Sequence, residues 1–126
     1  MTEPVGDIHS FLEIVSIAEV ERDRSAIASQ CFSEGEMAEL ASRRTQTMAG
    51  FLALKKALAG LFSSAAGGAG FSERDFILSH DENGAPRLVS CPELPGGRGA
   101  LKVHLSISHT REWAYGLAAY QEDGDG

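Results

Sequence analysis

The sequence predicts an α+β domain in which one antiparallel sheet packs on a long central helix. Residues 45–62 form the only long stretch that is apolar nearly all round, which is typical of a buried helix. One strand-like segment precedes this stretch and four follow it. This order of elements favours a sheet that covers the helix.

The central stretch contains two charges, Lys55 and Lys56, side by side in its middle. Adjacent helix residues point about 100° apart, so the two lysines leave the helix on different faces. We expect one to reach solvent along its aliphatic stem and the other to face a cleft; the alternative is that both reach solvent. A membrane-spanning role is disfavoured, because each central lysine would cost about 2.5–3.5 kcal/mol.

Length and charge narrow the class of protein. The chain has 126 residues, which fits one domain over 1–126 with frayed ends at about 1–6 and 121–126. Its net charge of −7 disfavours nucleic acid and anionic membranes as partners. Cys31 and Cys91 lack metal-type spacing, and residues 1–10 lack a signal peptide, so we expect a cytoplasmic protein with reduced thiols.

The N-terminal half reads as a strand followed by helices. Residues 11–17 are rich in β-branched side chains and predict a strand that carries Glu13. Residues 18–30 form a polar helix of mixed charge. Ser33 and Glu36 have the spacing of a capping box, which starts a helix that continues over 37–44.

The C-terminal half reads as strands separated by loops. A small-residue loop over 63–70 matches no phosphate-binding fingerprint and is interpreted as a linker. Asn83-Gly84 predicts a tight hairpin turn, in which we expect His80 to face solvent. The expected strands are 75–79, 87–90, 102–108 and 113–120, with a second loop over 92–99 and a turn over 109–112.

Four of these segments resemble motifs of the holo-acyl-carrier-protein synthases, the small phosphopantetheinyl transferases. The stretch SISHT, residues 106–110, resembles the family's terminal signature, and HDENGAP, residues 80–86, resembles its Asp-x-x-Gly-x-Pro turn. MAGFLALKKAL, residues 48–58, resembles the central helix, and FLEIVSIAEV, residues 11–20, resembles the opening strand. The resemblance extends from about residue 11 to 122 and keeps the four motifs in register.

The resemblance implies transfer of phosphopantetheine from coenzyme A to a serine of an acyl or peptidyl carrier protein, as in fatty acid biosynthesis. It implies Mg²⁺ bound by a strand Asp and a helix Glu, and a homotrimer with sites between subunits. Lys55 and Lys56 then fall at catalytic helix positions. Pro86, Ser108, His109 and Thr110 fall at coenzyme A-binding positions.

The chain departs from the family pattern at the positions of the family's metal ligands and of its conserved basic residues. Glu13 stands where the metal-binding Asp is expected, and Lys56 stands where the metal-binding Glu is expected. Gly60 replaces a second helix lysine, Phe51 replaces the helix arginine, and Glu19 replaces an arginine after the first strand. An ammonium cannot ligate Mg²⁺, which prefers oxygen ligands. Glu13 is therefore a doubtful metal ligand, and we expect it to pair directly with Lys56.

Three interpretations remain open at this point, of which one is that the resemblance extends to the fold alone and the site serves another ligand. The other two concern phosphopantetheine transfer. The first is an active phosphopantetheinyl transferase with a rearranged site. The second is a catalytically degenerate relative that binds coenzyme A or a protein partner without Mg²⁺-dependent transfer. The substituted residues by themselves slightly favour the second function, whereas the family resemblance by itself favours the first.

Overall fold

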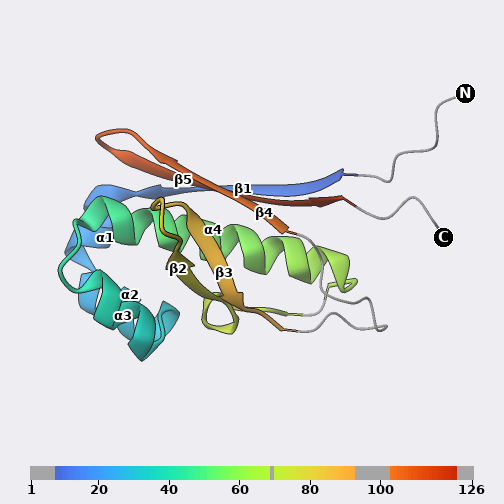
Figure 1. The fold of residues 1–126 in the computed structure, drawn as a ribbon, viewed down its shortest axis with the longest axis horizontal. Helices are drawn as coiled ribbons and strands as arrows, with labels where there is room; N and C mark the ends of the chain where they lie inside the picture. The colour runs from blue at the N-terminus through green and yellow to red at the C-terminus, as the bar shows by residue number, and fades with distance from the viewer. Residues whose placement is uncertain (1–7, 69, 93–102, 122–126) are drawn as a thin grey trace, which may run out of the picture.

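The computed structural model describes residues 8–68, 70–92 and 103–121. A long helix lies under a sheet, with shorter helices at one end and a separate β-hairpin at its side (Figure 1). The elements in chain order are β1 (Ile8–Ser16), α1 (Ile17–Arg22), α2 (Arg24–Cys31), α3 (Glu34–Leu40), α4 (Thr45–Ala65), the 3-10 helix η1 (Glu73–Asp75), β2 (Ile77–His80), β3 (Pro86–Ser90), β4 (Val103–His109) and β5 (Trp113–Gln121).

The main sheet is antiparallel, has the order β1-β5-β4, and so places the last strand in the middle. Leu12 and Ser106 both pair with Leu117 of β5, one on each side. Strands β2 and β3 form a second, two-stranded sheet. The expected α+β class with a sheet on a long helix is confirmed, but the single sheet is corrected to two.

Helix α4 supplies most of the core, as its apolar sequence predicts. Leu52 is 3 % exposed and Leu58 is fully buried. The helix contacts all three strands of the main sheet as well as α1 and η1. Because neighbouring elements cover the helix on several sides, its sequence is apolar nearly all round.

The helix boundaries differ from the expectation at three places. The polar helix expected over 18–30 is two helices, which meet at Asp23, where φ is −107° and ψ is 22°. Helix α3 ends at Leu40 instead of continuing to residue 44. Helix α4 runs three residues beyond 62, because alanine and serine continue a helix until Gly67 and Gly68 adopt positive φ.

Two local motifs have the predicted structure. The Ser33 hydroxyl accepts a hydrogen bond from the Glu36 backbone N–H, and Glu36 accepts one in return from the Ser33 N–H, which completes the capping box. In the hairpin turn, Gly84 has a φ of 84°, and the Asp81 carboxylate accepts the N–H groups of Asn83 and Ala85.

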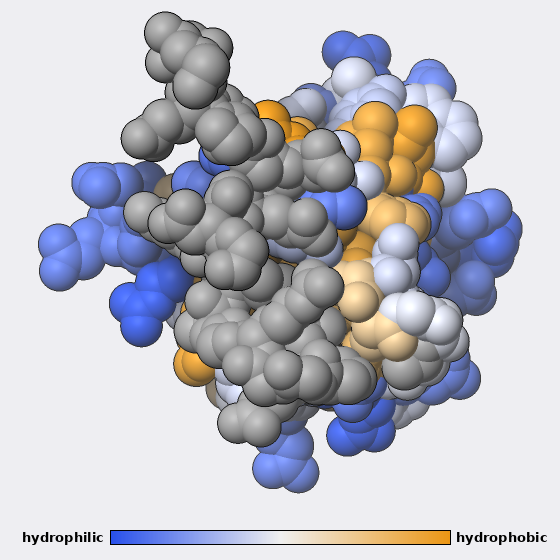
Figure 2. Space-filling model, turned by 90° about the vertical axis from the view of Figure 1, so that its right-hand side faces the viewer, coloured by the Kyte–Doolittle hydropathy of each residue, from blue (hydrophilic) through white to orange (hydrophobic). Residues whose placement is uncertain are grey.

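Part of the surface is apolar. Figure 2 views the molecule from the right-hand side of Figure 1 and shows a group of orange apolar residues beside blue polar ones. Among the described residues, no helix has the length and hydropathy needed to cross a membrane. The loop expected over 92–99, apart from its first residue, and the tail after 121 lie outside the described residues.

Candidate active site

Small residues on β5 bring α4 unusually close to the sheet. Ala114, Gly116 and Ala118 are buried and face the helix. A Cβ at Gly116 would collide with the backbone of Ala53 and Leu54. Because the helix lies so near the central strand, side chains from the two edge strands pack against its sides. Ile107 of β4 lies over Gly50 in this way.

Glu13 stands on the helix-facing side of β1, directly across from Gly116. It is half-buried, and within the described part of the chain its carboxylate forms no hydrogen bond or ion pair. Phe11 precedes it by two residues on the same strand face and is packed against the core. A carboxylate therefore stands on the side of β1 that faces α4, outside any ion pair of the described residues.

Lys56 does not pair with Glu13, which corrects the expected ion pair. Its Nζ lies 3.2 Å from Oε1 of Glu73, in the short helix η1. The side chains of Lys56 and Glu73 are 41 % and 26 % exposed. Burial opposes ionisation of Glu73, but a backbone hydrogen bond and the Lys56 ammonium outweigh it and lower the pKa of this carboxyl. Nothing in the sequence motifs had pointed to Glu73.

Lys55 is enclosed in the core instead of facing a cleft. Its Nζ lies 2.5 Å from Oε1 of Glu36 and 4.6 Å from the centre of the Phe32 ring. The second carboxylate oxygen of Glu36 accepts the Leu78 N–H at 2.9 Å. Burial lowers the pKa of Lys55, and the hydrogen bond to Glu36 opposes this shift. Lys55 therefore faces neither a cleft nor solvent, and its ammonium is paired with Glu36 inside the core.

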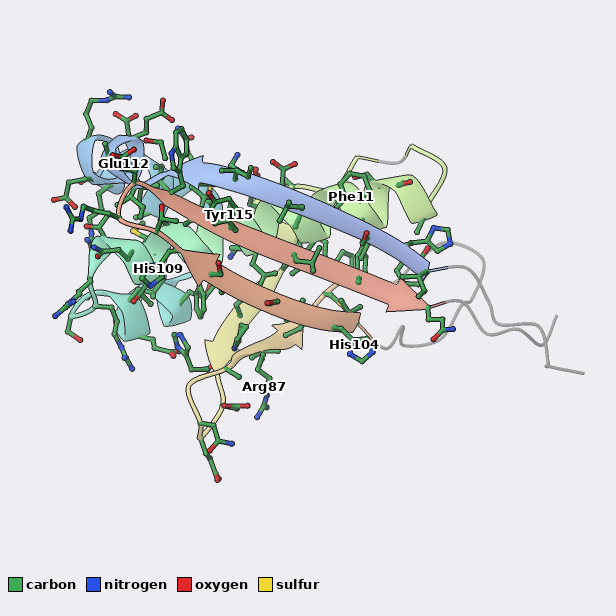
Figure 3. The ribbon with its side chains drawn as sticks, turned by 90° about the horizontal axis from the view of Figure 1, so that it is seen from above. Phe11, Arg87, His104, His109, Glu112 and Tyr115 are labelled. Atoms are coloured by element: carbon green, nitrogen blue, oxygen red, sulfur yellow. The ribbon has the colours of Figure 1, made fainter. Side chains whose placement is uncertain are left out.

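The signature segment at the end of β4 is divided between the two faces of the sheet. Ser108 faces outward beside Tyr115, whereas His109 shares the helix-facing side with Ala114. Figure 3 shows His109 at the end of β4 and Tyr115 on the neighbouring strand. The Thr110 hydroxyl accepts the backbone N–H groups of Glu112 and Trp113 at 3.3 and 3.1 Å, so it holds the β4–β5 turn.

The predicted site residues therefore do not all come together within one chain. Glu13 and His109 lie on the two edge strands, which are separated by about 9–10 Å because β5 runs between them. Ser108 and Glu13 lie on opposite faces of the sheet. Pro86 lines an open groove of about 500 Å³ between β3 and the start of β4, and the other predicted residues do not line it.

The side chain of His80 was expected in solvent but is held by two contacts, one with Glu39 and one with Phe51. Its Nδ1 lies 2.9 Å from Oε1 of Glu39, and its ring stacks on Phe51 with centroids 4.6 Å apart. Ser79 also donates a hydrogen bond to Glu39, at 3.2 Å. Phe51, which replaces the family's helix arginine, is thus used for packing and offers no cation.

The residues around Glu13 do not fit a magnesium site. The described residues contain no group of three or more His, Cys, Asp or Glu side chains placed to hold a metal ion. Glu13 is one carboxylate, and the second ligand position of the family carries the ammonium of Lys56. Mg²⁺ in proteins requires oxygen ligands, usually one or two carboxylates with water and phosphate oxygens.

No protein-family model matches the chain. Curated relatives do match it. The holo-[acyl-carrier-protein] synthase of Clostridium perfringens is 33% identical over 115 residues, which cover 79% of this chain and 85% of that protein. The synthase of Thermoanaerobacter sp. (strain X514) is 30% identical over 113 residues, covering 81% of this chain and 80% of that protein.

Solved structures of such synthases have the same fold as this chain. The structure of the Chronobacterium ammoniagenes ACPS–CoA complex matches it with a TM-score of 0.77 at 23% identity, and the match covers 93% of this chain and 98% of that chain. The Helicobacter pylori synthase in complex with coenzyme A has a TM-score of 0.67 at 25% identity, with 87% and 97% covered.

The fold and the segments in register define a phosphopantetheinyl transferase-like protein. The chain belongs to the holo-[acyl-carrier-protein] synthase family. These relatives favour group transfer over the alternative of a protein that only binds.

Proposed function

We propose that this protein transfers the 4′-phosphopantetheine group of coenzyme A to a serine hydroxyl of an acyl carrier protein. The observation that carries the proposal is its family membership, supported by sequence and fold over most of the chain. Coenzyme A is the substrate, and the carrier protein is the acceptor. We place the reaction in the cytoplasm and the whole chain in one domain.

In the proposed step, the serine oxygen bonds to the phosphorus that bears the pantetheine. The bond from that phosphorus to the bridging oxygen breaks, and 3′,5′-ADP leaves with the bonding electron pair. The serine proton passes to a base. Such a step depends on positioning and on stabilising the negative charge of the transferred and leaving groups.

Lys56 is the residue of α4 that can supply positive charge to this step. It is partly exposed, and its partner Glu73 is also partly exposed, so the ammonium can turn to a phosphate. A lysine contacts phosphate as a point charge without requiring a metal. Lys55 cannot do so, because Glu36 and the core enclose it. We derive no step through Mg²⁺.

The remaining contacts with coenzyme A are proposed to come from Pro86, Ser108, His109 and Thr110. Ser108 and Glu13 face opposite sides of their own sheet, so one ligand meets both only if a second copy contributes one of them. This supports sites between subunits, and we propose the homotrimer that the family resemblance implies. The outer face of the sheet is suitably apolar, with Leu12, Ile14 and Leu117 exposed by 57 %, 52 % and 38 %.

The test is transfer by the unmodified protein. It is incubated with coenzyme A and an unmodified acyl carrier protein, with added Mg²⁺ or with a chelator, and the carrier is analysed by intact mass spectrometry. A mass gain of one phosphopantetheine that is absent from a carrier with its acceptor Ser changed to Ala supports the proposal. Lys56→Met should lower the transfer rate. A carrier left unmodified in every buffer, while a relative's synthase modifies it, would overturn the proposed activity.

A further inference from the structure

The ring of Phe11 is seated on Gly60. A Cβ added at position 60 would lie 2.5 Å from Cδ2 and 2.7 Å from Cε2 of this ring. Both distances are shorter than any van der Waals contact between carbon atoms, which is about 3.5–4.0 Å at its optimum. Only glycine fits at position 60 while the Phe11 ring stays in this place.

This contact lies on the same side of the fold as Glu13 and Lys56. Phe11 and Glu13 are two residues apart on β1 and share its helix-facing side (Figure 3 labels Phe11). Lys56 and Gly60 are four residues apart on α4 and share one helix face. We call these four residues the β1 flank of the helix. Any side chain longer than glycine at position 60 would project into this flank.

Helix α4 has few charged side chains that could act at the β1 flank. Lys55 and Lys56 are its only charged residues. Lys55 is fully buried with Glu36, which leaves Lys56 to act toward an anionic ligand. A second cation could enter from position 60, one helical turn further along, but the Phe11 ring occupies the volume that its stem would need.

We propose that Phe11 is a specificity-determining residue of the β1 flank. Seated on Gly60, its ring excludes a second helix cation and limits the positive charge presented to a phosphate-bearing ligand to Lys56. The proposal deepens the proposed function, because it assumes that the anionic part of coenzyme A approaches this flank. It makes the residues at positions 11 and 60 an interdependent pair.

The test is a double-mutant cycle on the full chain with two readouts. The variants are Phe11→Ala, Gly60→Lys and the double variant, and Gly35→Lys is the matched control. Gly35 lies exposed in α3 with nothing within 4 Å of a Cβ, so its variant adds the same charge without a collision. Chemical denaturation gives the folding equilibrium constant, and calorimetry gives the dissociation constants for coenzyme A and for inorganic pyrophosphate.

We expect Gly60→Lys alone to lower the folding equilibrium constant at least about tenfold, because the ring must move. In the Phe11→Ala background, the factor by which Gly60→Lys lowers the folding equilibrium constant should be at least about fivefold smaller. This is expected because the effects of mutations at residues in contact are not additive. The double variant should bind coenzyme A about tenfold more tightly than Phe11→Ala does, as expected for one added charged contact. Gly35→Lys should leave the folding equilibrium constant and the dissociation constant for coenzyme A within about twofold of the wild-type values.

Additive losses at positions 11 and 60 would overturn the proposal, and so would a Gly60→Lys protein as stable as the wild type. Equal coenzyme A affinity in the double variant and Phe11→Ala would overturn it as well. These outcomes are separate from failure of the proposed function, which shows as absence of transfer by the wild type. Coupling in stability is measured without any ligand and does not depend on that activity.

Discussion

The ammonium of Lys55 lies 2.5 Å from a carboxylate oxygen of Glu36, and both side chains are almost completely buried. Glu36 also accepts backbone N–H groups from Ser33 and Leu78. One carboxylate therefore joins the start of α3 to α4 and to β2. A buried charge is tolerated only when a partner and hydrogen bonds replace its lost hydration, and Glu36 meets both needs.

Removing one member of this pair should be strongly destabilising. Lys55→Met leaves the Glu36 carboxylate buried without its counter-charge, so we expect a loss of about 3–5 kcal/mol of unfolding free energy. Urea denaturation measures it. Lys56→Met is the matched control and should cost less than about 1 kcal/mol, because its ion pair is partly exposed. Equal losses for the two variants would contradict the assignment of Lys55 to the core.

Exchanging Lys56 for glutamate should create a better metal site. Lys56→Glu places a second carboxylate at the family's ligand position and removes the ammonium that opposes Mg²⁺. Without metal the new carboxylate faces Glu73, so the melting temperature should fall below that of Lys56→Gln. Added Mg²⁺ should raise the melting temperature of Lys56→Glu and leave the wild type nearly unchanged. A wild type that Mg²⁺ stabilises equally would contradict our view of the donor set.

The Glu39–His80 pair should make the free energy of unfolding depend on pH in the acidic range. The hydrogen bond with His80 is the main cause that lowers the pKa of Glu39 from its ordinary value of 4.5. Because the folded-state pKa is the lower one, this contribution is complete above about pH 4.5 and is lost as the pH falls through the folded-state pKa. Between pH 7 and pH 3, Glu39→Gln should lose less unfolding free energy than the wild type does.

The measurement for this pair is urea denaturation at a series of pH values. Glu82→Gln is the control, since Glu82 is exposed in the adjoining turn. It should retain the pH dependence of the wild type. A Glu39→Gln protein whose stability follows the wild-type pH curve would show that the pair does not form in solution.

The outer face of the main sheet should hold the subunits together. Leu117→Glu places a charge at the middle of this face, where the neighbouring Leu12 and Ser106 pair with it on either side. We expect sedimentation to show a trimer for the wild type and a smaller species for this variant, because burying an unpaired carboxylate is costly. Val89→Glu, on the exposed part of β3, is the control and should remain trimeric. A wild type that sediments as a monomer would refute the proposed assembly.

Several features of this protein follow from the sequence because they depend on neighbours in the chain. The apolar stretch around Leu52 and Leu58 predicts a buried helix, since its periodicity leaves no polar face. The capping box at Ser33 and the turn at Gly84 are set by residues within four positions of one another. The α+β class, the central helix and the resemblance to the family were therefore accessible without coordinates, whereas the division of residues 18–30 into two helices was not.

The partners of the charged side chains were decided by the tertiary structure alone. Lys55 and Glu36 are 19 positions apart, and Lys56 and Glu73 are 17 apart, so no local pattern connects them. The resemblance to the family predicts that Lys56 lies near Glu13. In the structure the Lys56 ammonium pairs instead with the Glu73 carboxylate of η1. Long-range pairing depends on how α4 packs against its neighbours. A helix that is apolar nearly all round does not show in its sequence which neighbour each lysine will meet.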